Sequence, residues 1–185
     1  MKKLFLLTAA ICLTAIFTGN VSAQDPDNAG DVVTYQLDAM RILDIEGTAP
    51  ALHLIKPNEA GAAVPDVTSE LSWINYTSVV ASEVTNKITV SLNKVPSTFT
   101  TLKVVAASHA GTGNGTYGTP SVERTLSTEA QDIITAIGSC WTGTGNTNGH
   151  KLTYTWGITS GSYANAISVA SAADVTATYT IIATP

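Results

Sequence analysis

The sequence predicts an all-β protein whose mature part folds as an antiparallel β-sandwich of the immunoglobulin-like kind, with a small β-barrel as the alternative. Two observations support this prediction. Apolar residues alternate with Thr, Ser and other short polar residues in several segments of strand length. Clusters of Gly, Asn and Pro separate these segments, and such clusters are typical of turns and loops.

The N-terminal residues have the organisation of a cleavable signal peptide. Lys2 and Lys3 form a positive start, residues 4–17 are mostly apolar, and residues 21–23 are the small residues that a signal peptidase accepts. The apolar stretch is shorter than the ~20 residues that a membrane-spanning helix needs. We therefore predict a signal peptide at residues 1–23, a flexible leader at 24–31 and a single sandwich domain at 32–185.

The secreted chain is expected to be acidic. The whole sequence has nine Lys and Arg against fourteen Asp and Glu, a net charge of −5. Cleavage removes two lysines and no acidic residue, which moves the net charge to −7. Because such a surface repels nucleic acid and anionic lipid, we expect no nucleic-acid partner and no stable membrane insertion after cleavage.

The first predicted strand covers residues 33–45. Its first half alternates strictly, and the residues that share its apolar face are Val33, Tyr35, Leu37 and Ala39. The pattern then changes register before Gly47, which indicates a β-bulge.

Later strands follow at the spacing of a sandwich, at residues 51–55, 71–77, 87–92, 102–107, 152–158 and 175–181. Within residues 71–77, the alternation places Ile74 and Tyr76 on one face of the strand and Trp73 and Asn75 on the other. Residues 127–138 are compatible with either a short helix, which Ser127 could cap, or a β-branched strand.

Two glycine-rich runs, at residues 111–115 and 143–146, share the sequence GTGN. Neither continues into the Gly-Lys-Ser/Thr of a phosphate-binding loop, and neither opens a helix after a buried strand. We therefore interpret both as turns in which Gly and Asn supply positive φ angles.

No arrangement of reactive side chains indicates catalysis, so the sequence predicts neither an enzyme nor a metal or cofactor site. His53, His109 and His150 have no metal-ligand spacing between them. Cys12 would leave with the signal peptide, so Cys140 remains alone and is expected to be a small buried hydrophobic residue.

The three tryptophans are the best candidates for contact with a ligand. Trp73 and Trp156 lie inside alternating segments and are expected in the core. Trp141 borders a Gly- and Asn-rich loop, and a flat exposed indole suits the face of a sugar ring. Trp141 is therefore the candidate ligand-stacking residue, with packing in the core or at a sheet edge as the alternative.

Several segments together form a familiar pattern: LDIEG, LSWINYTS, KITVSL, LSTEAQDIITAIGSCWTGTG, LTYTWGI and VTATYTI. Most of residues 32–182 resembles the small secreted β-sandwich proteins of Gram-negative bacteria that are similar to fimbrial and spore-coat-like subunits. The resemblance implies a subunit of the periplasm, cell surface or an extracellular appendage. Its expected partners are copies of itself or other surface subunits.

Such subunits can assemble when one copy lends a strand to the next, which requires an alternating apolar segment beside a flexible tether. Residues 24–31 could be the tether, and Val33, Tyr35, Leu37 and Ala39 the inserted face. The alternative is that this strand pairs within its own domain. The sequence thus leaves two functions open: a structural or adhesive surface subunit, for which the resemblance implies a fimbrial role and a pilin-like sandwich, and a module that binds carbohydrate or another ligand.

Overall fold

The computed structural model describes residues 32–166 and 174–184, and the predicted signal peptide and leader lie outside these residues. Contacts along the chain divide it into two units, Met1–Gln36 and Leu37–Pro185. Within the described residues, the second unit contains eleven strands and a single short 3-10 helix at Tyr163–Asn165. In the same part of the chain, no helix has the length and apolar character needed to cross a membrane.

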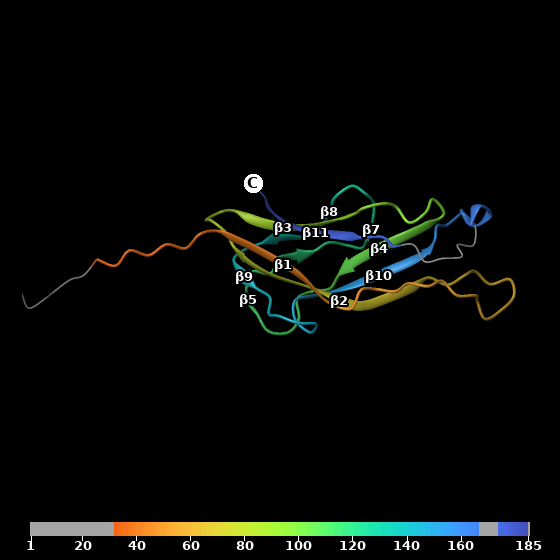
Figure 1. Cartoon of the computed structure of the whole chain (residues 1–185), viewed down its shortest axis with the longest axis horizontal. Helices are drawn as coiled ribbons and strands as arrows, with labels where there is room; N and C mark the ends of the chain where they lie inside the picture. Colours follow the sequence, from red (N-terminus) through yellow and green to blue (C-terminus); the bar gives the residue numbers. More distant parts are fainter. Residues whose placement is uncertain (1–31, 167–173, 185) are drawn as a thin grey trace, which may run out of the picture. The chain divides into compact units, whose positions relative to one another are not determined.

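The larger sheet is built around the long strand β2. Its hydrogen-bonded path runs through β5 (Asn114–Gly115), β9 (Cys140–Trp141), β2 (Val67–Val79), β10 (His150–Ile158), β4 (Thr100–Ala106) and β7 (Arg124–Thr125) (Figure 1). β9 and β10 pair with different stretches of the same edge of β2, which is possible because β2 is thirteen residues long. β1 (Met40–Gly47) pairs with the opposite edge of β2. The edge strand β1 follows only its second half, from Ser72 to Val79.

The smaller sheet contains, in order, β11 (Ala177–Thr184), β3 (Thr85–Leu92), β8 (Gln131–Ile137) and β6 (Thr119–Pro120). All strand pairs in both sheets are antiparallel. The two sheets are not closed on each other, so the predicted β-sandwich is confirmed and the barrel alternative is wrong.

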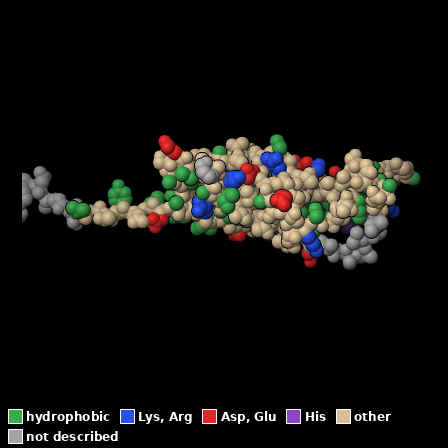
Figure 2. Space-filling model, turned by 90° about the horizontal axis from the view of Figure 1, so that it is seen from above, with side chains coloured by type: hydrophobic (Ala, Val, Ile, Leu, Met, Phe, Trp, Pro, Cys, Tyr) green, Lys and Arg blue, Asp and Glu red, His purple; other side chains and the backbone are tan. Residues whose placement is uncertain are grey.

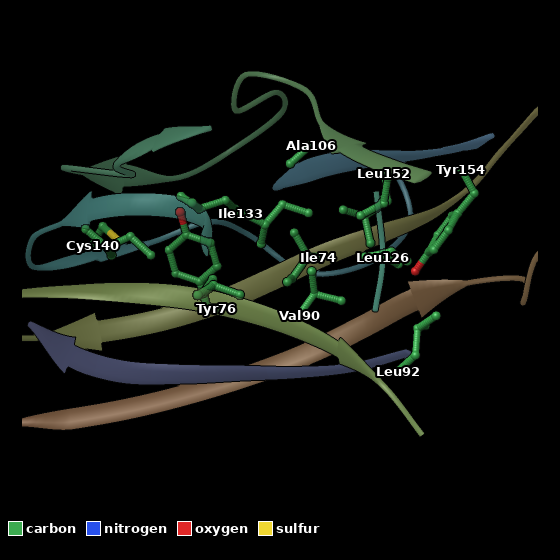
Figure 3. Packing of buried hydrophobic residues seen from close by; sticks show 14 residues of the cluster. Ile74, Tyr76, Val90, Leu92, Ala106, Leu126, Ile133, Cys140, Leu152 and Tyr154 are labelled. Carbon is green, nitrogen blue, oxygen red and sulfur yellow. The ribbon is translucent and has the colours of Figure 1, made fainter. Parts of the chain in front are cut away.

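The core lies between the two sheets. Ile74, Ile88, Ile133 and Leu152 are fully buried, and Figure 3 shows side chains of both sheets meeting in this space. Alternation explains the arrangement, because every second residue of a strand points to the same face. Each such side chain contributes about 1.5–3 kcal/mol when it leaves water. Ile74 and Tyr76 face the core as predicted, but Trp73 lies on the other face of β2, so the prediction that it lies in the core is wrong.

Residues 127–138 form a strand and not a helix. β8 covers Gln131–Ile137, and its isoleucines Ile133, Ile134 and Ile137 are all fully buried. β-Branched side chains are stiff and pack well on a pleated surface, which favours the strand. The pairing of β8 with β3 shifts register twice, and Ala136 has a φ of 55° within this irregular stretch.

The predicted strand at residues 33–45 is only partly correct. β1 begins at Met40 and pairs with β2 in continuous register without a bulge. Met40 lies opposite Val79, where β2 ends, so the ladder between β1 and β2 begins at Met40. The predicted strand at residues 51–55 is wrong, because Gly47, at a φ of 96°, turns the chain out of the ladder just before it.

Candidate functional site

The described residues before β1 form an exposed apolar segment, residues 33–39, which we call the N-terminal segment. It has no strand assignment. Val33, Tyr35 and Leu37 are 76%, 91% and 72% exposed, and Ala39 is exposed as well. The four predicted donor-face residues therefore lie on one stretch of chain with their side chains in solvent.

Each sheet has an open edge strand on the same side of the sandwich. Within the described part of the chain, β1 pairs only with β2 and β11 pairs only with β3, and β1 and β11 contact each other. Ile45 of β1 is 41% exposed, although its cross-strand partner Ile74 is fully buried. Directly paired residues point to the same face of a sheet. The smaller sheet therefore covers Ile74 but leaves part of the inner face of β1 uncovered beside β11.

Trp141 lies on the outer face of the larger sheet and is 50% exposed. Strand pairing places it between Thr77 of β2 and Asn114 of β5, and Thr77 in turn pairs with Ile42 of β1. We call these four residues the Trp141 row. Neighbouring strands are ~4.8 Å apart, so the row is a strip about 14 Å long.

A shallow depression of about 310 Å³ adjoins the Trp141 indole. It is lined by Thr77, Ser78, Val79, Asn114, Gly115, Ser139, Cys140 and Trp141. Gly115 permits the close approach of β5 and β9 that forms it, because a Cβ there would lie 2.2 Å from the Ser139 carbonyl oxygen. Among the described residues, the side chains of Asn114 and Thr77 make no hydrogen bond. Their polar groups are therefore available to a ligand.

Cys140 lies under the same depression as a free, buried thiol, which confirms the prediction of a small buried residue. Burial raises the pKa of this thiol to about 11. It therefore stays protonated at neutral pH, and a protonated thiol is a poor nucleophile.

Two histidines and two tyrosines meet at one end of the core, a cluster that the sequence did not predict. The Tyr76 hydroxyl donates a hydrogen bond to the Tyr117 carbonyl and lies 2.9 Å from Nε2 of His150. Nδ1 of His150 donates to the carbonyl of Ala107 at 2.8 Å. The His109 ring stacks on the Tyr117 ring with centroids 3.6 Å apart, and the two imidazole centroids are 5.8 Å apart.

This cluster joins segments that are distant in the sequence. Burial lowers the pKa of His150 and raises the pKa of the Tyr76 hydroxyl, so both groups are neutral at pH 7. Neutral, hydrogen-bonded rings tie the loop around Tyr117 to the larger sheet. Alternation along β10 was a usable signal, because His150, Leu152 and Tyr154 occupy every second position and all three are buried.

His53 lies away from this cluster, on the exposed stretch after β1. Within residues 32–166 and 174–184, no three His, Cys, Asp or Glu side chains are placed to hold a metal ion. On the face shown in Figure 2, Lys and Arg side chains lie interspersed with Asp and Glu side chains, and several lie next to one of opposite sign.

The fold and these surfaces define the class of the protein as a two-sheet antiparallel β-sandwich preceded by an exposed apolar segment. No protein-family model, no curated protein and no solved structure matches the chain.

Proposed function

We propose that this chain is a secreted structural or adhesive subunit of a Gram-negative cell surface, fimbrial in type, that assembles with copies of itself. The N-terminal segment of one copy is donated as a strand to the next. The observation that supports this most directly is the exposure of Val33, Tyr35 and Leu37 on a stretch whose own β2 ends opposite Met40.

Exposed alternating side chains are the first requirement of strand donation. Large apolar side chains in water are unfavourable by about 1.5–3 kcal/mol each relative to burial, and a second copy can remove that cost. In an extended conformation, all four apolar residues of the segment point to one side, with Thr34, Gln36 and Asp38 on the other. The segment thus has one face for a core and one face for solvent.

The open edge of β11 is the proposed acceptor. An added strand gains backbone hydrogen bonds from an unpaired edge, and its alternate side chains supply specificity. β11 is eight residues long, which is enough to pair with the seven residues of the N-terminal segment. A strand added there would also lie beside the uncovered inner face of β1, where Ile45 is exposed.

Two neighbouring substitutions test the donor. Tyr35→Asp places a charge on the apolar face of the segment, and Thr34→Asp places the same charge on its opposite face. Sedimentation velocity on the mature chain should show concentration-dependent oligomers for the wild type and for Thr34→Asp. Tyr35→Asp should be a monomer with unchanged thermal unfolding. A wild type that stays monomeric at every concentration contradicts the proposal.

Hydrogen exchange tests the acceptor. Amides at the open edge of β11 should exchange more slowly in the assembled wild type than in the Tyr35→Asp monomer, because assembly pairs them. A fluorescent peptide of residues 32–40 should bind the monomer and protect the same amides. Protection at β1 with none at β11 would show that the acceptor is wrong while donation itself holds.

A further inference from the structure

We propose that the Trp141 row is a binding site for a neutral oligosaccharide, a function that is independent of strand donation. The row contains a half-exposed indole, an exposed aliphatic side chain at Ile42, and the polar groups of Thr77 and Asn114 in one line across the outer face of the sheet.

The chemistry of the row fits a sugar chain. A pyranose ring has a face of C–H groups, which packs on an indole, and a rim of hydroxyls, which need hydrogen-bond partners. Trp141 supplies the flat surface. The Asn114 amide can both donate and accept, and so can the Thr77 hydroxyl. Among the described residues neither side chain has another hydrogen bond, so a ligand would not have to displace one.

The size of the site also favours an oligosaccharide over a protein partner. The depression beside Trp141 is about 310 Å³, which is at the lower end of the range for small-molecule sites. A stable protein interface buries about 800 Å² on each partner, from roughly 20–30 residues a side. Four side chains in a row fall far short of that.

Charge decides between neutral and anionic sugars. None of the four residues in the row is ionisable. On the same face, the two neighbouring rows along β1 are Met40 with Val79 and Asp44 with Asn75, and the whole chain has a net charge of −5. Arg41, the neighbour of Ile42, belongs instead to the inner-face pair with Ser78 and donates to the Asn86 side chain. An anionic polysaccharide would therefore meet net repulsion and no positive charge within the row. The proposed ligand is therefore a neutral oligosaccharide and not an anionic one.

The backbone around Trp141 is rigid, which keeps the indole in place for a ligand. β9 is held on both sides, by Thr77 and Ser78 of β2 and by Asn114 and Gly115 of β5. The next residue, Thr142, is fully buried, and its hydroxyl and the Tyr76 backbone are hydrogen-bonded to each other. Little conformational entropy would be lost when a sugar binds to a surface that is already ordered.

The experiment uses the mature chain with Tyr35→Asp, so that self-assembly does not interfere. Isothermal titration calorimetry, which does not depend on the tryptophan that the variants remove, follows titration with cellohexaose, chitohexaose and maltohexaose, and with a heparin-derived hexasaccharide as the anionic probe. We expect at least one neutral sugar to bind and the heparin fragment not to bind. Trp141→Ala should weaken binding by about tenfold or more, as for other buried aromatic contacts. Trp141→Phe keeps a flat ring and should weaken binding less than Trp141→Ala. Asn114→Ala should weaken binding several-fold.

Controls separate the ligand site from a fold defect and from assembly. Circular dichroism checks that the variants fold, and an intact Tyr35 or its replacement by Ala should not alter sugar binding. The proposal is overturned if no neutral sugar binds, if only the heparin fragment binds, or if Trp141→Ala binds as tightly as its parent. It is also overturned if Trp141→Ala abolishes self-assembly in the otherwise wild-type chain and leaves sugar binding intact.

Discussion

The N-terminal segment and β11 have almost the same sequence pattern, but the segment is exposed to solvent whereas β11 is paired with β3. Both place a tyrosine at the centre of an alternating run, Tyr35 in the first and Tyr179 in the second. Tyr35 is 91% exposed, whereas Tyr179 packs against the core and its hydroxyl lies 2.6 Å from the hydroxyl of Tyr154. An alternating pattern allows a segment to pair as a strand, but the segment does so only where a partner strand lies beside it.

The difference comes from the register of neighbouring strands. All eight residues of β11 have a partner on β3, from Thr85 to Leu92. β2, by contrast, stops at Val79, opposite Met40. The ladder between β1 and β2 therefore does not continue into the N-terminal segment, and this is why we propose an acceptor for that segment in a second copy.

The largest expected effect is the difference in stability between variants of the two tyrosines. Tyr179→Ala should lower the free energy of unfolding by about 3 kcal/mol, because it removes a packed ring and leaves the Tyr154 hydroxyl without its partner. Tyr35→Ala should change it by less than about 0.5 kcal/mol, because its ring is in solvent. Urea unfolding of both variants under conditions where the chain is monomeric measures the two values. Similar losses would mean that Tyr35 is packed within its own domain.

A smaller effect separates backbone strain from crowding within one loop. Gly145 and Gly149 have φ angles of 86° and 81°, so alanine is strained at either position. A Cβ at Gly145 has no atom within 4 Å, whereas at Gly149 it would lie 2.3 Å from the Asn75 side-chain oxygen and from the Ile74 carbonyl oxygen. We expect a loss of about 1 kcal/mol for Gly145→Ala. Gly149→Ala should lose about 2 kcal/mol more.

Thermal or urea unfolding of the two glycine variants measures how much free energy of unfolding each one loses. Equal losses would show that the packed loop relaxes around an added carbon, and that strain alone accounts for both. Unlike the tyrosine pair, the glycine pair would then reflect local conformation and not coverage by neighbouring segments.

Short-range pattern predicted most of the fold. The core faces of β2, β3 and β10 followed from alternation, and the positive φ angles of Gly143 and Gly145 confirm the turn expected at residues 143–146. The turn expected at residues 111–115 is only partly correct, because Gly111 and Gly113 have positive φ angles but Asn114 and Gly115 form β5. Asn supplies none of these angles, since the positive φ values outside glycine are at Glu83 and Ala136 in the described chain. Strand ends were predicted poorly at β1, because they depend on where the partner strand stops.

The candidate sites needed information that alternation does not contain. Trp141 was singled out by its place beside a loop, but its neighbours Ile42 and Asn114 come from strands far away in the sequence. The pairing of His109 with Tyr117 and of His150 with Tyr76 likewise depends on how the loops fold over the sheet end. Only the inward position of His150 was accessible from its own strand.

The smallest expected effect is a pH dependence of stability. It tests the contrast between packed and exposed regions, because burial acts on ionisable groups only where the chain is packed. Burial lowers the pKa of His150 in the folded chain below its ordinary value of 6.5. Below pH 6.5 the unfolded chain therefore takes up a proton that the folded chain does not. The free energy of unfolding should be constant above this pH and fall below it, by at most about 1.4 kcal/mol per pH unit.

Urea unfolding at pH 7.5, 6.5 and 5.5 measures this slope in the wild type, in His150→Gln and in His53→Gln. Glutamine at position 150 does not titrate, so that variant should lose the contribution of the buried histidine to the slope, whatever its stability at pH 7.5. His53→Gln is the matched control, because it removes a histidine from an exposed position outside the core. Parallel slopes for the wild type and His150→Gln, or a wild type that gains stability in acid, would mean that the folded chain accepts the proton. The carbonyl of Ala107 and the hydroxyl of Tyr76 would then stabilise an imidazolium despite its burial.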